Sequence, residues 1–153
     1  MGYDSHRFAA GRRLVLGGVE IPHEAGLTGH SDADAVAHAV IDALLGAACA
    51  GSIGDHFPDT DPRWKNADSM QLLREVTSLV RERGHSVAHA DVTIIAQRPK
   101  LAPHAPAIAA ALEAALGTGA GHVNVKAKTN EGMGFIGREE GLAVIAVATL
   151  EAR

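Results

Sequence analysis

Two short segments of the chain carry residue types that bind divalent metals. Asp4 and His6 are separated by one residue, so on an extended segment both side chains point to the same side and can share one ion. A second polar cluster, residues 30–34, is followed by His38 inside an apolar run. Two imidazoles and one carboxylate, with a fourth position open, are a ligand set typical of catalytic zinc. We therefore predict a metal site formed by Asp4, His6 and His38.

The surroundings of His38 allow a second interpretation at this point. Asp34, His38 and Asp42 recur every four residues and would line one stripe of a helix that is otherwise apolar. Burying such groups without partners would cost several kcal/mol, so a hydrogen-bonded core cluster also explains them. If a metal is bound, Asp34 or Asp42 is the expected residue to orient the His38 ring.

Further polar segments stand at the ends of predicted elements, where binding sites concentrate. Taken singly, each is typical of an ordinary turn. Together they supply lysine, threonine hydroxyl and backbone N–H donors for phosphate, and Glu131 for a hard cation such as magnesium. The segments are residues 52–54, 57–61, 96–100 and 126–131.

Composition limits the class of protein. The 153 residues, 46% of them hydrophobic, suffice for one core, so we expect a single domain over residues 1–153. A formal charge of -4 argues against non-specific binding to a nucleic-acid backbone. Because we find no leader peptide and no apolar run of about 20 residues, we expect a soluble, cytoplasmic protein.

The elements that must position the candidate residues follow from periodicity and turn signals. Residues 14–21 predict a hairpin around Gly17-Gly18, and residues 23–30 and 52–62 predict loops. Ser31 and Asp34 have the spacing of a capping box. Helices are predicted over about 33–50 and 68–83 and from Pro103 to Leu116, and strands over 87–97, 123–129 and 142–150.

Strands and helices are interleaved, but two strands are consecutive at each end of the chain. This order indicates an α+β fold. We predict a mixed four-stranded sheet with helices on one face, plus a small hairpin.

Over nearly its whole length the chain resembles the 2-C-methyl-D-erythritol 2,4-cyclodiphosphate synthases of the non-mevalonate isoprenoid pathway. Residues 2–6 resemble the first metal motif of that family and residues 30–38 resemble its second. Further similar motifs lie at residues 57–62, 91–97 and 123–131 and at Gly134, Phe135, Gly137 and Arg138.

The resemblance implies a metal-dependent phosphorus–oxygen lyase. Its reaction would convert 4-diphosphocytidyl-2-C-methyl-D-erythritol 2-phosphate to 2-C-methyl-D-erythritol 2,4-cyclodiphosphate by intramolecular phosphoryl transfer, with release of CMP. The resemblance also implies a homotrimer with an active site at each subunit interface.

The resemblance assigns roles by matching position. Asp4, His6 and His38 would hold Zn²⁺ on the β-phosphate, and Glu131 would hold Mg²⁺ or Mn²⁺ between the α- and β-phosphates. His30 and Thr129 would correspond to transition-state stabilisers. Residues 52–54 and 57–61 would contact the erythritol phosphate, and residues 96–102 with Lys128 would bind the cytidine end across the subunit interface. The residues implied to bind substrate or a related ligand are Asp4, His6, His30, Ser31, Ser52, Ile53, Gly54, Phe57, Pro58, Asp59, Thr60, Asp61, Ala96, Gln97, Arg98, Pro99, Lys100, Leu101, Ala102, Lys128, Thr129, Asn130, Glu131, Phe135 and Arg138.

Phe135 and Arg138 resemble residues that line a central cavity of the family's trimer, where isoprenoid diphosphates bind. The chain departs from the family pattern at Ser52, where Asp is common, and at Gly132, where Lys is common. Only Met1 precedes the first motif, so we expect a short first strand.

Two other functions remain open from the sequence. A zinc-dependent phosphoesterase would use the same three ligands to activate water. A non-catalytic trimer would bind isoprenoid diphosphates through Arg138.

Overall fold

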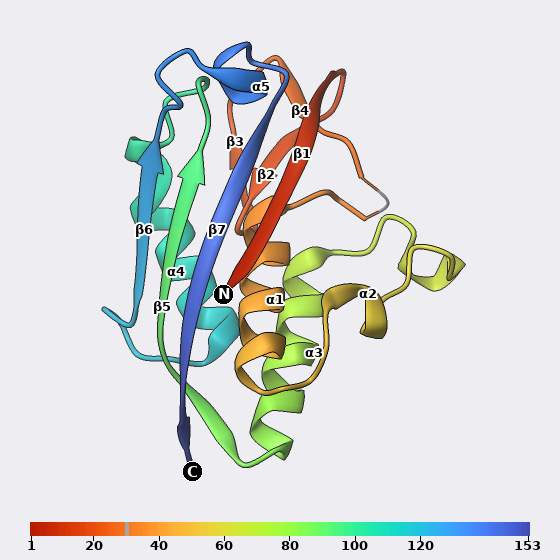
Figure 1. The fold of residues 1–153 in the computed structure, drawn as a ribbon, viewed down its shortest axis with the longest axis vertical. Coiled ribbons are helices and arrows are strands. Elements are labelled where there is room, and N and C mark those ends of the chain that lie inside the picture. The colour runs from red at the N-terminus through yellow and green to blue at the C-terminus, as the bar shows by residue number, and fades with distance from the viewer. Residues whose placement is uncertain (30) are drawn as a thin grey trace.

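The computed structural model describes residues 1–29 and 31–153. Its main feature is a five-stranded sheet in the order β4-β1-β7-β5-β6 (Figure 1). The β5–β6 pair is parallel and the other pairs are antiparallel, so the sheet is mixed as predicted. The strands are β1 Gly2–Ala10, β4 Ala25–Leu27, β5 His85–Ile95, β6 Val123–Lys128 and β7 Gly141–Ala152.

The prediction of four strands was wrong because β4 lies in a segment expected to be a loop. Three residues with Gly26 in the middle give no alternating pattern. They form a strand because β1 extends to Ala10 and offers them an edge, pairing Phe8 with Leu27 and Ala10 with Ala25.

The expectation of a short first strand was also wrong, since β1 has nine residues. Residues 2–7 pair with β7 and residues 8–10 pair with β4, so cross-strand partners stabilise a polar segment. Alternation along β1 leaves Tyr3 and Ser5 exposed, while Asp4 and His6 point toward the helical layer and are half-buried.

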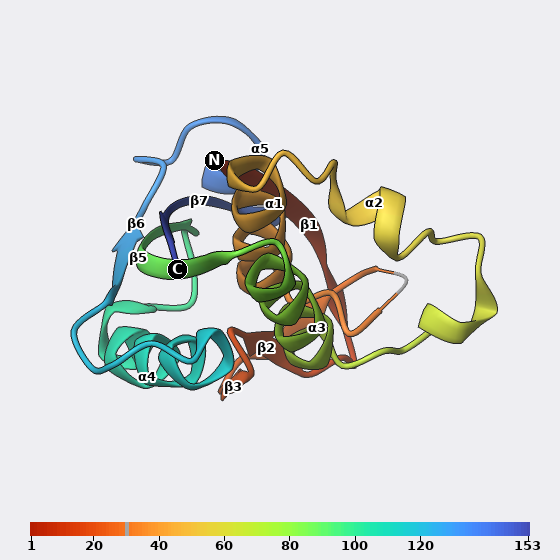
Figure 2. The same ribbon diagram turned by 90° about the horizontal axis from the view of Figure 1, so that it is seen from below.

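Three helices cover one face of the sheet, as predicted (Figure 2). They are α1 Ala35–Ala47, α3 Ser69–Glu82 and α4 Ala105–Leu116. Helix α1 lies against β1 and β7, and α4 lies against β6. The core fills the space between these layers with small and aliphatic side chains, and no polar residue of α1 is fully buried.

Helix α1 begins after Asp34, whose side chain accepts hydrogen bonds from the backbone N–H groups of Val36 and Ala37. The same carboxylate accepts the N–H groups of Gly17 and Gly18, at 2.8 and 2.7 Å. Asp34 is therefore the N-cap, and the predicted Ser31–Asp34 capping box does not form. Its buried carboxylate ties the hairpin to the start of the helix.

That hairpin is confirmed as β2 Leu14–Leu16 paired with β3 Val19–Ile21. Gly17 and Gly18 form its turn at φ of 58° and 75°, a conformation that glycine adopts without steric cost.

Short elements occupy the connections between the longer helices and strands. The loop predicted over 52–62 contains α2 Ile53–His56 and the beginning of the 3₁₀ helix η1 Pro62–Trp64. A second 3₁₀ helix, η2 Ala102–His104, precedes α4, and α5 Gly134–Gly137 precedes β7. Among the described residues, no helix combines the length and apolar character needed to cross a membrane.

Candidate metal centre and adjoining pockets

Asp4 and His6 from β1 meet His38 from α1 between the sheet and its helical layer. The Asp4 Oδ2 atom lies 2.8 Å from His6 Nε2 and 3.1 Å from His38 Nδ1. The two imidazole nitrogens are 3.4 Å apart. The three predicted ligand atoms thus converge on one point, although 34 residues separate Asp4 from His38.

The donor set and its spacing fit a tetrahedral metal ion. Ligands at about 2.0–2.1 Å from zinc stand roughly 3.3 Å from one another, close to the three distances between these atoms. The side chains are 13–24% exposed, so the cluster is not sealed from water. Three protein ligands that leave a fourth position to water or substrate are typical of catalytic zinc, whereas structural sites usually have four protein ligands.

Hydrogen bonds at the other ring nitrogens fix both imidazoles. His6 Nδ1 donates to the carbonyl of Thr28 at 2.7 Å, which leaves Nε2 free for a metal. His38 Nε2 lies 2.8 Å from the Ser69 hydroxyl, which leaves Nδ1 free.

The prediction that Asp34 or Asp42 orients His38 was wrong. Asp34 caps the helix, and Asp42 accepts a hydrogen bond from the backbone N–H of Ile53 at 2.7 Å. The contact that orients the ring comes from Ser69 at the start of α3, which no local sequence pattern connects to His38.

Protonation equilibria in the cluster reflect its close packing. In the metal-free protein, burial opposes ionisation of Asp4, but hydrogen bonds that the His38 and His6 rings donate to it outweigh burial and lower the pKa of Asp4 to about 2. Burial likewise opposes protonation of His6, but the hydrogen bond and charge of Asp4 outweigh it and raise the pKa of His6 above 6.5. The carboxylate therefore stays available as a ligand across the physiological range.

A pocket of about 390 Å³ opens beside the two histidines. Aromatic rings form part of its wall, with Phe57 and Trp64 packed edge to face at 5.0 Å between centroids. A metal held by His6 and His38 would therefore lie beside this space. The lining residues are His6, Ser31, His38, Ile53, Gly54, Phe57, Pro58, Asp59, Trp64 and Leu72.

Of the eight residues in the predicted segments 52–54 and 57–61, five line this pocket and three do not. Ser52 donates through its hydroxyl to Asp55 at 2.8 Å, within the turn that begins α2. Asp61 accepts hydrogen bonds from Arg63 and caps η1. Thr60 stands beside Asp61 and is also absent from the lining. Conversely, Trp64 and Leu72 line the pocket but were not predicted, because their apolar character indicated only packing.

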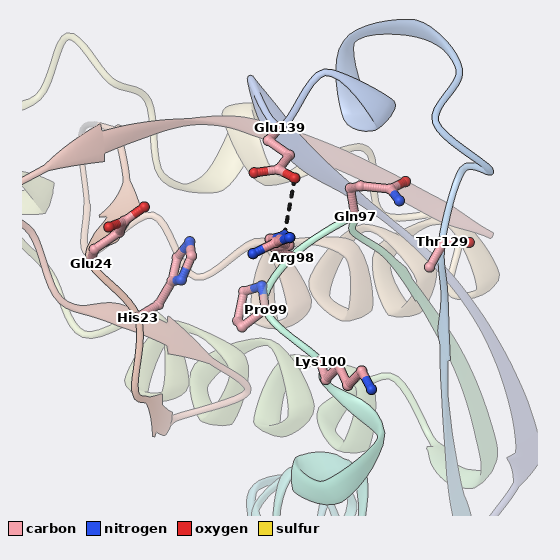
Figure 3. A pocket seen from close by; sticks show the side chains of 8 residues that line it. All are labelled: His23, Glu24, Gln97, Arg98, Pro99, Lys100, Thr129 and Glu139. Carbon is pink, nitrogen blue, oxygen red and sulfur yellow. Dashed lines mark ion pairs between the residues drawn. The ribbon is translucent and has the colours of Figure 1, made fainter.

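A second hollow, of about 780 Å³, lies at the carboxyl ends of β5 and β6 (Figure 3). Arg98 points toward Glu139, and the two side chains form an ion pair at 3.2 Å. Its lining residues are His23, Glu24, Gln97, Arg98, Pro99, Lys100, Thr129 and Glu139. An adjoining space of about 280 Å³ is lined by Ala96, Gln97, Pro99, Lys100, Leu101, Ala102, Pro103, Ala127, Lys128 and Thr129.

These two hollows gather all the residues of the predicted 96–102 segment together with Lys128 and Thr129. None of their described lining residues also lines the pocket beside His38. Within one chain, the predicted cytidine-binding and metal-binding residues therefore occupy separate sites.

Glu131 lies near Thr129 and apart from the three metal ligands. Its Oε1 accepts a hydrogen bond from the Thr129 hydroxyl at 2.8 Å, and its backbone has φ of 51°. Within residues 1–29 and 31–153, the group of ligands able to hold one metal contains Asp4, His6 and His38 only. Asn130 donates through its amide to the Met133 carbonyl at 2.9 Å.

Phe135 lines a small hollow of about 170 Å³ with residues of β1 and β7. The Arg138 guanidinium donates to Glu140 at 2.6 Å, and this charge pair holds the pKa of Glu140 below its usual value. Phe135 is 40% exposed.

His30 lies outside the described residues, so its predicted roles stay predictions.

The chain matches the model of the YgbB family over residues 1–151. It is 60% identical over 150 residues to the "Bifunctional enzyme IspD/IspF" of Anaeromyxobacter dehalogenans, covering 98% of this chain and 39% of that protein. It is 58% identical over 150 residues to the 2-C-methyl-D-erythritol 2,4-cyclodiphosphate synthase of Dechloromonas aromatica, covering 98% and 94%.

A solved structure of a 2C-methyl-D-erythritol-2,4-cyclodiphosphate synthase in a CDP-bound form superposes with a TM-score of 0.89 at 40% identity. The match covers 98% of this chain and 97% of that one. The chain thus spans most of the single-function relatives and about two fifths of the bifunctional one.

Proposed function

The chain belongs to the YgbB family, and from this membership we propose that it is a 2-C-methyl-D-erythritol 2,4-cyclodiphosphate synthase. It converts 4-diphosphocytidyl-2-C-methyl-D-erythritol 2-phosphate to the cyclic diphosphate and releases CMP. The observation that carries the proposal is the cluster of Asp4, His6 and His38, which opens on a pocket beside it. Relatives with the synthase name share more than half of their residues with this chain.

The chemistry needs no protein base to create the nucleophile. A phosphate monoester is largely dianionic at neutral pH, so an oxygen of the 2-phosphate attacks the β-phosphorus directly. The bond from the β-phosphorus to the CMP oxygen breaks, and CMP leaves. What the protein must supply is an in-line geometry for a flexible substrate and compensation of its negative charge.

The residues of the first pocket are suited to bending the substrate. Phe57 and Trp64 offer an apolar wall to the carbon skeleton, and the Ser31 hydroxyl lies among the lining groups. We assign the metal at Asp4, His6 and His38 as Zn²⁺, which when bound would polarise the β-phosphate and neutralise part of its charge. The three ligands hold this position on rigid elements, a strand and a helix.

The residues of the second site are suited to the nucleotide half. The side chains of Lys100 and Lys128 bring positive charge near the hollow at the ends of β5 and β6. We propose that Thr129 and His30 stabilise the transition state. Glu131 would hold Mg²⁺ or Mn²⁺, which would neutralise negative charge on the phosphates when bound.

A homotrimer would complete the active site. The two pockets share no described lining residue, so we propose that the nucleotide site of one chain faces the metal site of the next. The sheet face opposite the helices exposes Tyr3 by 53% and Val147 by 47%, which gives neighbouring chains an apolar surface to cover. Phe135 and Arg138 would then line a central cavity that accepts an isoprenoid diphosphate.

Light scattering tests the assembly without reference to activity. A trimer has three times the 15.8 kDa mass of the chain. A protein that remains monomeric at assay concentration would contradict the shared active site.

Phosphorus NMR of the reaction tests the function. Purified protein is incubated with the cytidine diphosphate substrate, zinc and magnesium, and a matched sample contains a chelator. We expect CMP and a cyclic diphosphate in the first sample only. Inorganic phosphate with an uncyclised product would instead identify a phosphoesterase, and unchanged substrate with both metals present would contradict the proposal.

A further inference from the structure

Ser69 and Asp32 stand behind His38, on the side away from Asp4 and His6. His38 Nε2 lies 2.8 Å from Ser69 Oγ, and the Ser69 hydroxyl in turn donates to Asp32 Oδ1. We infer that Asp32 and Ser69 form a relay that positions His38 as a metal ligand. This inference rests on the proposed metal site and deepens it by naming the residues that hold its helical ligand in place.

The protons of the relay can be placed by elimination. Asp32 accepts at both oxygens, because Oδ2 receives the backbone N–H of Ser69 at 3.0 Å and Oδ1 receives that of Asp34 at 3.2 Å. The Ser69 hydroxyl therefore gives its one proton to Asp32 and faces His38 with a lone pair. It follows that Nε2 of His38 carries the ring proton and Nδ1 presents its lone pair to the metal.

Ser31 also lies close to His38 Nε2, but it is not the residue that orients the ring. Its Oγ lies 3.1 Å from His38 Nε2 and 3.4 Å from Ser69 Oγ, and it accepts the backbone N–H of Ala33 at 3.3 Å. The Ser31 side chain also lines the pocket beside the metal site. The shorter contact to Ser69 makes that residue the acceptor that fixes the ring.

The relay is built into the fold and is not a surface contact. Ser69 is fully buried as the first residue of α3, and Asp32 also donates its backbone N–H to the carbonyl of Ala67 at 3.2 Å. These hydrogen bonds join the N-terminus of α3 to the segment that precedes α1. An imidazole held this way keeps one tautomer and one orientation, which for metal-binding histidines typically strengthens binding about 10- to 100-fold.

The Ser69→Ala variant tests the relay with zinc as the only ligand. It removes the hydroxyl but keeps the backbone N–H bond to Asp32, so the N-terminus of α3 stays hydrogen-bonded to the segment before α1. Ser78→Ala is the matched control, because Ser78 is exposed on the same helix and its hydroxyl donates only to the carbonyl of Arg74. Zinc affinity is measured by competition with a chromophoric chelator, and circular dichroism and thermal unfolding of the zinc-free proteins check the fold.

We expect Ser69→Ala to weaken zinc binding about 10- to 100-fold, with Ser78→Ala unchanged. Asp32→Asn should also weaken binding, and adding it to Ser69→Ala should cause no further loss, since both act through one ring. Unchanged affinity in Ser69→Ala, or additive losses in the double variant, would overturn the relay. A wild-type protein that binds no zinc would overturn the proposed metal site itself.

Histidine ring NMR provides a readout that needs no variant. In the zinc-loaded wild-type protein, ¹⁵N–¹H correlation spectra should show His38 protonated at Nε2 and metallated at Nδ1. Zinc on Nε2, with the proton on Nδ1, would overturn the assignment even if Ser69→Ala failed to fold.

Discussion

Gly2, two residues before the ligand Asp4, packs directly against the backbone of α1. A methyl group at this position would lie 2.0 Å from the carbonyl oxygen of Ala39 and 2.7 Å from the backbone nitrogen of Ala43. Both contacts are with helix backbone, which cannot rotate aside as a side chain would. Gly2→Ala should therefore push the strand and the helix apart.

The size of the effect follows from these distances. Ordinary contact begins near 3.4 Å, so β1 must move by about 1.4 Å to relieve the 2.0 Å approach. Overpacking of this kind costs about 2–3 kcal/mol, or roughly 4–12 °C in Tm for a chain of this length. Asp4 shares the moving strand, while His38 stays on the helix. Because metal–ligand distances tolerate only about 0.2 Å, zinc affinity should fall by about tenfold or more.

Thermal unfolding of the zinc-free protein and zinc competition measure the two effects separately, at matched protein concentration because assembly shifts Tm. Gly46→Ala is the control, since Gly46 lies in α1 with no atom within 4 Å of an added methyl. That substitution should raise stability by about 0.5–1 kcal/mol and leave zinc binding unchanged. If Gly2→Ala matches the wild-type protein in both Tm and zinc affinity, the steric reasoning is refuted.

Three other perturbations have expected outcomes. His38→Ala should lose nearly all bound zinc yet keep its far-UV circular dichroism, because alanine favours the helix that carries it; full zinc occupancy by mass spectrometry would contradict the ligand assignment. Asp34→Ala should cost about 3–5 kcal/mol in denaturant unfolding, because it removes the cap of α1 and leaves the turn between β2 and β3 without its acceptor; a loss below 1 kcal/mol would contradict this. The contacts to Asp4 raise the pKa of His6 above 6.5, so the apparent zinc affinity should begin to fall as the pH drops through that raised pKa, because protons then compete for the ring. In the zinc-free protein the sign reverses: stability from protonated His6 is fully present below pH 6.5 and lost as pH rises through the raised pKa. An apparent zinc affinity that is flat between pH 8 and 5.5 would refute the first part, and zinc-free stability that does not fall above pH 6.5 would refute the second.

Local patterns in the sequence predicted the helices and strands well where apolar residues recur at a regular spacing. The strand predicted over 87–97 is β5 His85–Ile95, and the helix predicted over 68–83 is α3 Ser69–Glu82. In each case the periodicity comes from side chains that all face one core, so it is visible without knowing the partner.

The errors occurred where pairing, not composition, makes the structure. β4 exists because the far end of β1 offers it an edge, and β1 is long because β7 and β4 pair with it along its whole length. Cross-strand hydrogen bonds of this kind leave no local trace in either segment. The sequence therefore predicted one strand too few. The shorter first strand was predicted because only Met1 precedes the first motif, whereas pairing extends the strand beyond that motif to Ala10.

In the candidate site too, local spacing predicted one part and contacts between distant segments decided the rest. The spacing of Asp4 and His6 predicted a shared ligand because a strand places alternate side chains on one side, and that much the sequence determined by itself. Only the tertiary structure decided that His38 meets them and that Ser69, 31 residues farther along the chain, orients its ring. These contacts depend on how α1 and α3 pack against each other and the sheet, and packing distances between elements are set by the whole core, not by any one segment.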